Sequence, residues 1–199
     1  MTNFLAIDTS SKYLSVVAKK GEKVVQKYLP DCALNHSVML MDEIDKAMKE
    51  CSLLPCECDF FCAVTGPGSF TGIRIGIATV KGLAVGVGKS LAQITSFEQV
   101  AYNVNMRDFC VVIDAGHDYY YACAYRDKKE IIPPCYLSRE QVENLNKELV
   151  GFEDLDLKNY TKISLDGCLY NAVMGKKPQM ASDISALYIR KSQAEENRK

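Results

Sequence analysis

The chain has 199 residues, a formal net charge of −1 and a hydrophobic fraction of 48%. This length is sufficient to bury a core without disulfide or metal staples, as one compact unit or as two small lobes. The near-zero charge, with lysines and arginines scattered along the chain, provides no strong electrostatic attraction for nucleic acid. Nine cysteines, an odd number, favour buried thiols in a reducing compartment. The first residues show no basic region ahead of an apolar stretch, so we expect a cytoplasmic protein.

The first half of the chain alternates between strand and helix patterns. We expect strands at 4–7, 13–19 and 23–29, an amphipathic helix at 36–51, a buried strand at 60–64, a helix at 71–87, a short strand near Leu91 and a helix from Ser96. Three hairpin-connected strands followed by helix, strand and helix predict a mixed sheet flanked by helices.

A Gly-Pro-Gly turn at 66–68 joins the buried strand to the second helix. The first N–H groups of that helix lack intrahelical acceptors. Either Ser69 or Thr71 caps them, or an anion such as phosphate occupies this end. The sequence leaves both alternatives open.

The helix at 71–87 carries glycines along one face. At about 100° per residue, Gly72, Gly76, Gly82 and Gly86 fall within an arc of roughly 120°. Because each glycine costs about 1 kcal/mol of helix stability relative to alanine, we expect close packing there, against either the protein's own sheet or a partner. We do not expect a membrane span, since the short run contains Arg74 and Lys81.

The second half begins by repeating the first. The strand that ends in Asp8, Thr9 and Ser10 has a counterpart at 110–116, which contains Asp114, and each is followed by a second apolar strand. Aspartate is an ordinary turn residue at either site alone. The repetition predicts a duplicated lobe, with lobes at 1–105 and 106–199 and strand ends that face a shared cleft.

Five segments carry a resemblance to known proteins. They are Leu-Ala-Ile-Asp-Thr-Ser at 5–10, His-Ser at 36–37, Gly-Pro-Gly-Ser-Phe-Thr-Gly-Ile-Arg-Ile-Gly at 66–76, Lys-Gly-Leu-Ala at 81–84 and Tyr-Ile-Arg at 188–190. With the repeated strand pattern, they resemble the two-lobed actin, Hsp70 and sugar-kinase (ASKHA) superfamily, and more closely the bacterial TsaB (YeaZ) family. The chain departs from the family pattern after Asp114, where Gly116 replaces an arginine and tyrosines at 119–121 replace a glutamate region. We expect at least one of these tyrosines in the core.

The resemblance implies an α/β fold with two duplicated mixed-sheet lobes, reduced in size, and a role in forming threonylcarbamoyladenosine next to the anticodon of tRNA. It implies a non-catalytic subunit that binds a TsaD-like catalytic paralogue, joined by a TsaE-like ATPase, with tRNA contacted through the complex only. It also implies that the first two helices form the partner interface. The residues expected there are Val38, Met41, Ile44, Asp45, Met48, Gly72, Ile73, Arg74, Gly76, Ile77 and Val80.

We predict no catalytic residues, no cofactor and no metal site. The chain has two histidines, His36 and His117, too far apart in sequence for a metal motif with paired histidines at helical spacing. His36 is expected at a helix start as a surface or capping residue. A vestigial phosphate site remains a candidate, formed by Asp8, Thr9, Ser10, Gly66, Gly68, Ser69 and Asp114.

Two alternatives stay open. The chain is either a scaffold subunit or an independent small ATP- or phosphate-binding enzyme of the kinase superfamily. In addition, the exposed helices are able to pair in a homodimer when the chain is alone. The polar segment 191–199 is expected to be a solvated tail.

Overall fold

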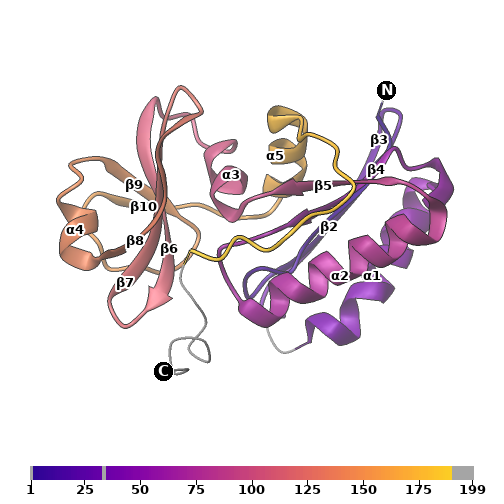
Figure 1. Cartoon of the computed structure of the whole chain (residues 1–199), viewed down its shortest axis with the longest axis horizontal. Helices are drawn as coiled ribbons and strands as arrows, with labels where there is room; N and C mark the ends of the chain where they lie inside the picture. Colours follow the sequence, from indigo (N-terminus) through magenta and orange to yellow (C-terminus); the bar gives the residue numbers. More distant parts are fainter. Residues whose placement is uncertain (1, 33–34, 190–199) are drawn as a thin grey trace.

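The structure is a computed structural model that describes residues 2–32 and 35–189. It contains two five-stranded sheets, one in each lobe, with strand orders β3-β2-β1-β4-β5 and β10-β9-β6-β7-β8 (Figure 1). Arg190, which belongs to one of the motifs above, and the expected tail at 191–199 lie outside the described residues.

The first lobe follows the predicted elements closely. Its strands are β1 (Phe4–Asp8), β2 (Leu14–Lys20), β3 (Lys23–Leu29), β4 (Phe60–Val64) and β5 (Ser90–Ile94), and its helices are α1 (His36–Cys51), the 3-10 turn η1 (Pro55–Glu57) and α2 (Phe70–Val87). Strands β1, β2 and β3 pair antiparallel, whereas β4 pairs parallel with β1 and β5. The expected mixed sheet is therefore confirmed.

The second lobe repeats this arrangement. It comprises α3 (Ser96–Ala101), β6 (Asp108–Gly116), β7 (Tyr119–Arg126), β8 (Lys129–Ser138), α4 (Arg139–Glu143), β9 (Glu148–Gly151), β10 (Tyr160–Lys162) and α5 (Cys168–Lys176). Strands β6, β7 and β8 pair antiparallel and β6, β9 and β10 pair parallel, as in the first sheet. The fold is thus the expected α/β fold with duplicated lobes.

Each sheet is covered in part by a helix from the other half of the chain. Helix α3 packs into the core of the second sheet through Phe97 and Val100. Helix α5 packs on the first sheet, where Leu169 and Val173 join the cluster around Phe4. A division of the chain at residue 105 stays a prediction, since each lobe is completed by a helix from the other part of the chain.

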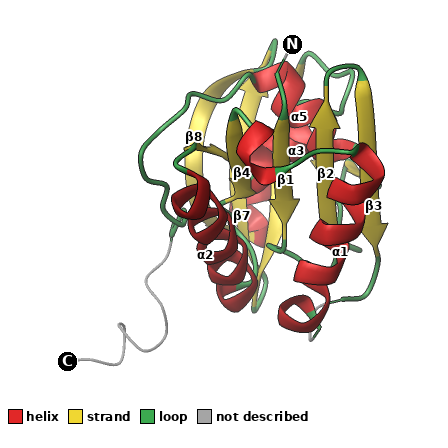
Figure 2. Ribbon diagram, turned by 90° about the vertical axis from the view of Figure 1, so that its right-hand side faces the viewer, coloured by secondary structure: helices red, strands yellow, loops and turns green. Residues whose placement is uncertain are grey.

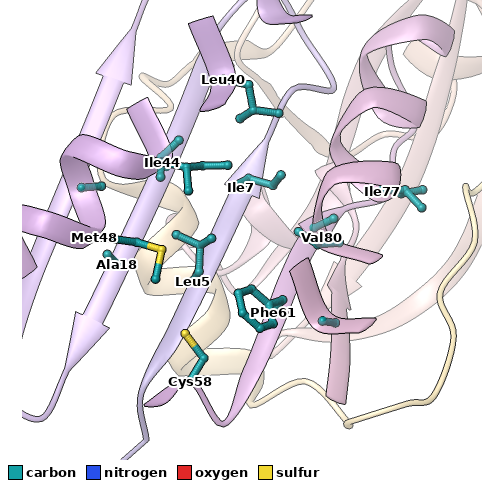
Figure 3. Close-up of a cluster of buried hydrophobic side chains, with 14 of the residues drawn as sticks. Leu5, Ile7, Ala18, Leu40, Ile44, Met48, Cys58, Phe61, Ile77 and Val80 are labelled. Atoms are coloured by element: carbon teal, nitrogen blue, oxygen red, sulfur yellow. The ribbon is translucent and has the colours of Figure 1, made fainter. Parts of the chain in front are cut away.

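Helices α1 and α2 cover one face of the first sheet (Figure 2). Between helices and sheet lies a buried cluster that includes Leu5 and Ile7 of β1, Ile44 of α1 and Val80 of α2 (Figure 3). Burying apolar area of this kind is the main stabilising term of a domain this size. It also fixes which faces of α1 and α2 point outward.

Helix α2 is capped by its own chain. The Ser69 hydroxyl oxygen accepts a hydrogen bond of 3.2 Å from the Gly72 N–H, and the helix ends at Gly88 in the left-handed conformation, with φ 65°. Of the two alternatives for this helix end, the Ser69 cap is the one observed. Among the described helices, α2 is the one long and apolar enough to cross a membrane. Six of its eighteen residues are buried against the sheet.

Candidate functional site

The first candidate site is a buried polar cluster at the end of β1. One carboxylate oxygen of Asp8 accepts hydrogen bonds from the N–H of Ser10, at 2.8 Å, and from its hydroxyl, at 2.7 Å. The Ser10 hydroxyl also lies 3.2 Å from that of Ser96. Asp8, Thr9 and Ser10 are each at most 2% exposed. The end of β1, where the sequence predicts a vestigial phosphate site, is therefore closed to solvent.

The Gly-Pro-Gly turn lies directly on this cluster. The Ser69 N–H donates a hydrogen bond of 2.7 Å to the Ser10 carbonyl, and the Ser96 N–H donates one of 2.8 Å to the Gly66 carbonyl. At Gly68, where φ is +154°, an added Cβ would lie 2.1 Å from the Ser10 carbonyl oxygen. Glycine is required because backbone meets backbone at this point.

The environment of Asp8 disfavours its charged form. Burial raises the pKa of the Asp8 carboxyl, and the two hydrogen bonds from Ser10, with a smaller electrostatic contribution from His36, lower it in part. Among the described residues, the Gln99 side-chain nitrogen is buried and meets no acceptor with hydrogen-bond geometry. His36 is 2% exposed, and its Nε2 lies 3.1 Å from the Tyr13 carbonyl. The expectation that His36 is a surface residue is wrong, because the start of α1 packs against the chain at Tyr13.

Asp114 does not join this cluster. It lies exposed at the tip of β6 in the other sheet, where its carboxylate accepts a 2.8 Å hydrogen bond from the Gly116 N–H. Its own N–H donates to Glu153 Oε2 at 2.6 Å. The structure thus brings together the phosphate-site candidates of the first lobe and leaves Asp114 in a separate environment.

Glu153 is a feature that sequence reasoning missed. Burial raises the pKa of its carboxyl to about 7, and the neighbouring Asp114 adds to the rise. The sequence does contain a pattern that could have indicated this residue. Glu153 comes shortly after the apolar strand β9, just as Asp8 stands at the end of the apolar strand β1. A carboxyl that titrates near neutral pH at a strand end is a candidate functional group.

The second candidate site is the outer surface of α1 and α2. Of the predicted interface residues, Val38 is 74% and Met41 53% exposed, and Asp45 and Arg74 are also exposed. The others are buried against the sheet, as Figure 3 shows for Ile44, Met48, Ile77 and Val80. The remaining buried members are Gly72, Ile73 and Gly76. In this conformation the former group is exposed to a partner, whereas the latter group belongs to the core, and of these buried residues Ile44 and Met48 also line a surface groove.

The glycine face of α2 is divided between two environments. An added Cβ would lie 1.9 Å from the Thr9 carbonyl oxygen at Gly72 and 2.6 Å from the Thr9 hydroxyl at Gly76. At Gly82 and Gly86 it would meet no atom of the described chain within 4 Å. The first pair therefore packs against the protein's own sheet, and the second pair is open. Leucine at Gly76 would strain the fold itself, so it is unsuitable as an interface probe.

An apolar groove runs between the two helices. It has a volume of about 560 Å³ and is lined by Met41, Ile44 and Met48 of α1, the turn at 52–55 and Leu83 of α2. Leu54, which belongs to this lining, is 60% exposed, whereas Val85, 82% exposed, lies about 160° around α2 from Leu83 and therefore away from the groove. Neither residue was predicted, because Leu54 lies in a turn and Val85 lies on the helix arc opposite the core. Among the described residues no group of three or more His, Cys, Asp or Glu side chains is arranged to hold a metal ion.

Comparisons with known proteins identify the family. Residues 29–186 match the family model described as TsaD, tRNA N6-adenosine threonylcarbamoyltransferase. A Bacillus subtilis protein named tRNA threonylcarbamoyladenosine biosynthesis protein TsaB is 29% identical over 130 residues, which cover 64% of this chain and 57% of that protein. The protein of the same name from Haemophilus influenzae is 27% identical over 220 residues, covering 94% of this chain and 92% of its own length.

A solved structure shows the same fold. YeaZ from Pseudomonas aeruginosa superimposes with a TM-score of 0.76 at 19% identity, over 94% of this chain and all of that chain. The aligned part of this chain spans little more than half of the Bacillus relative, whereas the YeaZ structure is matched throughout. Since the family model covers well over half of the chain, and the curated matches carry the TsaB name, the protein belongs to this family and, within it, to its TsaB (YeaZ) branch.

Proposed function

We propose that this chain is a non-catalytic subunit that binds a TsaD-like threonylcarbamoyltransferase through the outer surface of α1 and α2. In this role it supports the formation of threonylcarbamoyladenosine in tRNA, the pathway for which its TsaB relatives are named. The observation that carries the proposal is the apolar groove, together with the exposed side chains of Val38, Met41 and Leu54 on its α1 side. Contiguous exposed apolar surface marks protein interaction sites.

The open glycines indicate the kind of contact. Gly82 and Gly86 carry no side chain, and a Cβ added at either would meet no described residue within 4 Å apart from the nearby backbone of α2 itself. A partner helix is therefore able to approach the backbone of α2 closely and to place apolar side chains in the groove beside Leu83. Helix-in-groove recognition of this type is driven by a few anchors spaced along one helix face.

The closed strand end supports the non-catalytic part of the proposal. The Asp8 carboxylate accepts hydrogen bonds from the Ser10 N–H and hydroxyl, and the turn at 66–69 is hydrogen-bonded to the Ser10 carbonyl. A phosphate would have to displace that turn before it reached the strand end. By the family resemblance, a TsaE-like ATPase joins the complex, tRNA is contacted only through the assembled complex, and the setting is the cytoplasm.

The test is to measure the mass of the chain mixed with the TsaD-like protein of the same organism, by light scattering after size-exclusion chromatography. We expect a stoichiometric heterodimer. Met41→Lys and Leu54→Lys place a charge in the apolar groove and are expected to weaken the contact at least tenfold. Ile131→Lys is the matched control, because Ile131 is 42% exposed on β8, in the other lobe.

Two outcomes contradict the proposal. The first is a failure of the wild-type chain to associate, and the second is a complex that Met41→Lys and Leu54→Lys leave unchanged. The same experiment on the chain alone reports whether a second copy covers the groove. A homodimer broken by the same two variants would show that both partners use one surface.

A further inference from the structure

An extended segment follows α5 and runs along α2 (Figure 1). We call this segment, residues 178–189, the strap. Near its start, Ala181 and Leu91 of β5 are joined by two backbone hydrogen bonds, of 2.7 and 2.9 Å. Near its end, the Leu187 N–H donates a 2.8 Å hydrogen bond to the Thr65 carbonyl. Leu187 and Ile189 also pack against the core of the second lobe. The strap therefore binds both lobes.

Both charged side chains of α2 bind the strap. The Lys81 ammonium group is paired with Asp183 at 2.5 Å. The Arg74 Nε donates a 3.0 Å hydrogen bond to the Tyr188 hydroxyl. Since the higher position on the helix meets the lower position on the strap, the two segments run antiparallel. Exposed polar contacts of this kind contribute little stability, so their effect is to align the strap with the helix.

One buried side chain anchors the strap. Ile184 is 3% exposed and belongs to the buried cluster that contains Val80 of α2 and Leu91 of β5. It is the only buried residue among positions 178–189. Next to it, a polar pocket of about 560 Å³ lies between the strap, β5 and α3, so the strap does not pack on the sheet along its whole length. Segments with few buried side chains open at a lower free energy than the core.

The strap and the groove lie on opposite sides of α2. Leu83 lines the groove, and Lys81 binds the strap. The two residues are two positions apart, which places them about 160° apart around the helix. When the strap opens, Ile184 leaves the cluster in which Val80 packs, and α2 loses part of the support that positions Leu83.

We propose that the strap is a clasp that opens and closes as a unit while the rest of the chain stays folded, and that its closed state holds α2 in the position that forms the groove. The second part rests on the proposed function, because it concerns binding in that groove. A partner that prefers the closed state must slow the opening of the strap. By thermodynamic linkage, the factor is the one by which opening weakens the partner's binding.

Hydrogen exchange of the full chain, followed by NMR, tests the opening. The hydrogen-bonded N–H groups of Ala181 and Leu187 are expected to share one protection factor, well below that of β1. Ile184→Ala removes most of the anchoring side chain and is expected to speed their exchange at least about thirtyfold, with β1 unchanged. Val142→Ala is the matched control, because Val142 is 0% exposed in a separate cluster of the second lobe. It is expected to leave the exchange of the strap within twofold of wild type.

The complex with the TsaD-like protein tests the coupling to the groove. Saturation with this partner is expected to slow the exchange of the strap at least about fivefold, as measured by mass spectrometry on peptides from 178–189. Ile184→Asp places a charge in the buried cluster and is expected to hold the strap open. Isothermal titration calorimetry is expected to show that this variant binds the partner more weakly by the same factor, and Ile184→Ala by a smaller one. Unchanged exchange of β1 verifies that both variants are folded.

The outcomes separate the two parts of the proposal. If Ala181 and Leu187 exchange only together with β1, the strap does not open as a unit and the inference is overturned. If the wild-type chain forms no heterodimer, the proposed function fails and the coupling fails with it, whereas the exchange of the free chain still decides whether the clasp opens. A normal heterodimer that Ile184→Asp leaves equally tight, or that does not slow the exchange of the strap, would overturn the coupling alone.

Discussion

The Thr9 hydroxyl donates a 2.6 Å hydrogen bond to the Gly72 carbonyl, across 63 positions of sequence. The carbonyl oxygen of Thr9 in turn occupies the space in which a side chain at position 72 would begin, 1.9 Å from an added Cβ. The end of β1 and the first turn of α2 are thus in direct backbone contact. This contact sets the rotation of α2, and with it which residues point outward.

Two glycine substitutions on the same helix are expected to have opposite effects on stability. Gly72→Ala forces the first turn of α2 away from Thr9 and should lower the free energy of unfolding by about 1 to 3 kcal/mol or more. Gly86→Ala has open space around it and should raise that free energy by up to about 1 kcal/mol, because alanine favours the helix. Urea unfolding followed by circular dichroism measures both. If the two variants were equally stable, it would contradict the conclusion that Gly72 is packed against Thr9 whereas Gly86 faces open space.

Much of the fold was predictable from the sequence. The bounds of α1, β3 and β4 match the expected ranges, and β1 and α2 are each one residue longer than expected. These elements have strong periodicity or clear turn residues at their ends. One of the three tyrosines at 119–121, Tyr120, is buried at 4% exposure, as strand alternation required.

The outward face of the helices was not predictable in the same way. Helix α2 is apolar on nearly every side, so its periodicity alone does not say whether Ile77 or Val85 faces the sheet. The choice depends on the contact with Thr9, which is a long-range backbone contact. For the same reason, the spacing of Asp8 and Asp114 predicted two equivalent strand ends but not their environments. One is buried beneath the turn at 66–69, and the other is exposed.

The closed strand end leads to a prediction about nucleotide binding. Isothermal titration of the isolated chain with ATP and magnesium is expected to give no binding heat, because the turn at 66–69 covers Ser10. Asp8→Asn keeps an oxygen that is able to accept from Ser10 and is expected to fold and to bind the TsaD-like partner normally. ATP binding by wild type that is lost in Asp8→Asn would instead support the kinase-like enzyme.

Thiol reactivity provides a direct check of the core. Of the nine cysteines, Cys56 in η1 is exposed, Cys135 is half-buried and the others are buried. Burial also raises the pKa of Cys58 and Cys110 to about 12, which suppresses their reactive thiolates. Titration of the native protein with Ellman's reagent is expected to show about one fast thiol, removed by Cys56→Ser. Several fast thiols in Cys56→Ser would be incompatible with this packing.

The last prediction concerns Glu153 and the pH dependence of stability. The folded protein raises the pKa of this carboxyl from the ordinary value of 4.5 to about 7, chiefly by burial. Between these two values the folded state binds more protons than the unfolded state, so the free energy of unfolding falls as pH rises from about 4.5 to 7. At about 1.4 kcal/mol per pKa unit, the rise from 4.5 to about 7 corresponds to a loss attributable to Glu153 of about 3 kcal/mol.

Glu153→Gln isolates this contribution. Glutamine keeps an oxygen that accepts the Asp114 N–H, which donates to Glu153 at 2.6 Å, but it carries no titrating proton. Wild type and variant are expected to be equally stable near pH 4.5, and the variant is expected to be more stable by about 3 kcal/mol at pH 8. Urea unfolding at pH 4.5, 6, 7 and 8 measures the difference. Glu148→Gln is the control, because Glu148 is exposed at the start of β9, and it should keep the wild-type slope. If Glu153→Gln keeps that slope as well, the carboxyl is ionised in the folded protein at neutral pH, and the strand ends of the second lobe carry a full negative charge there.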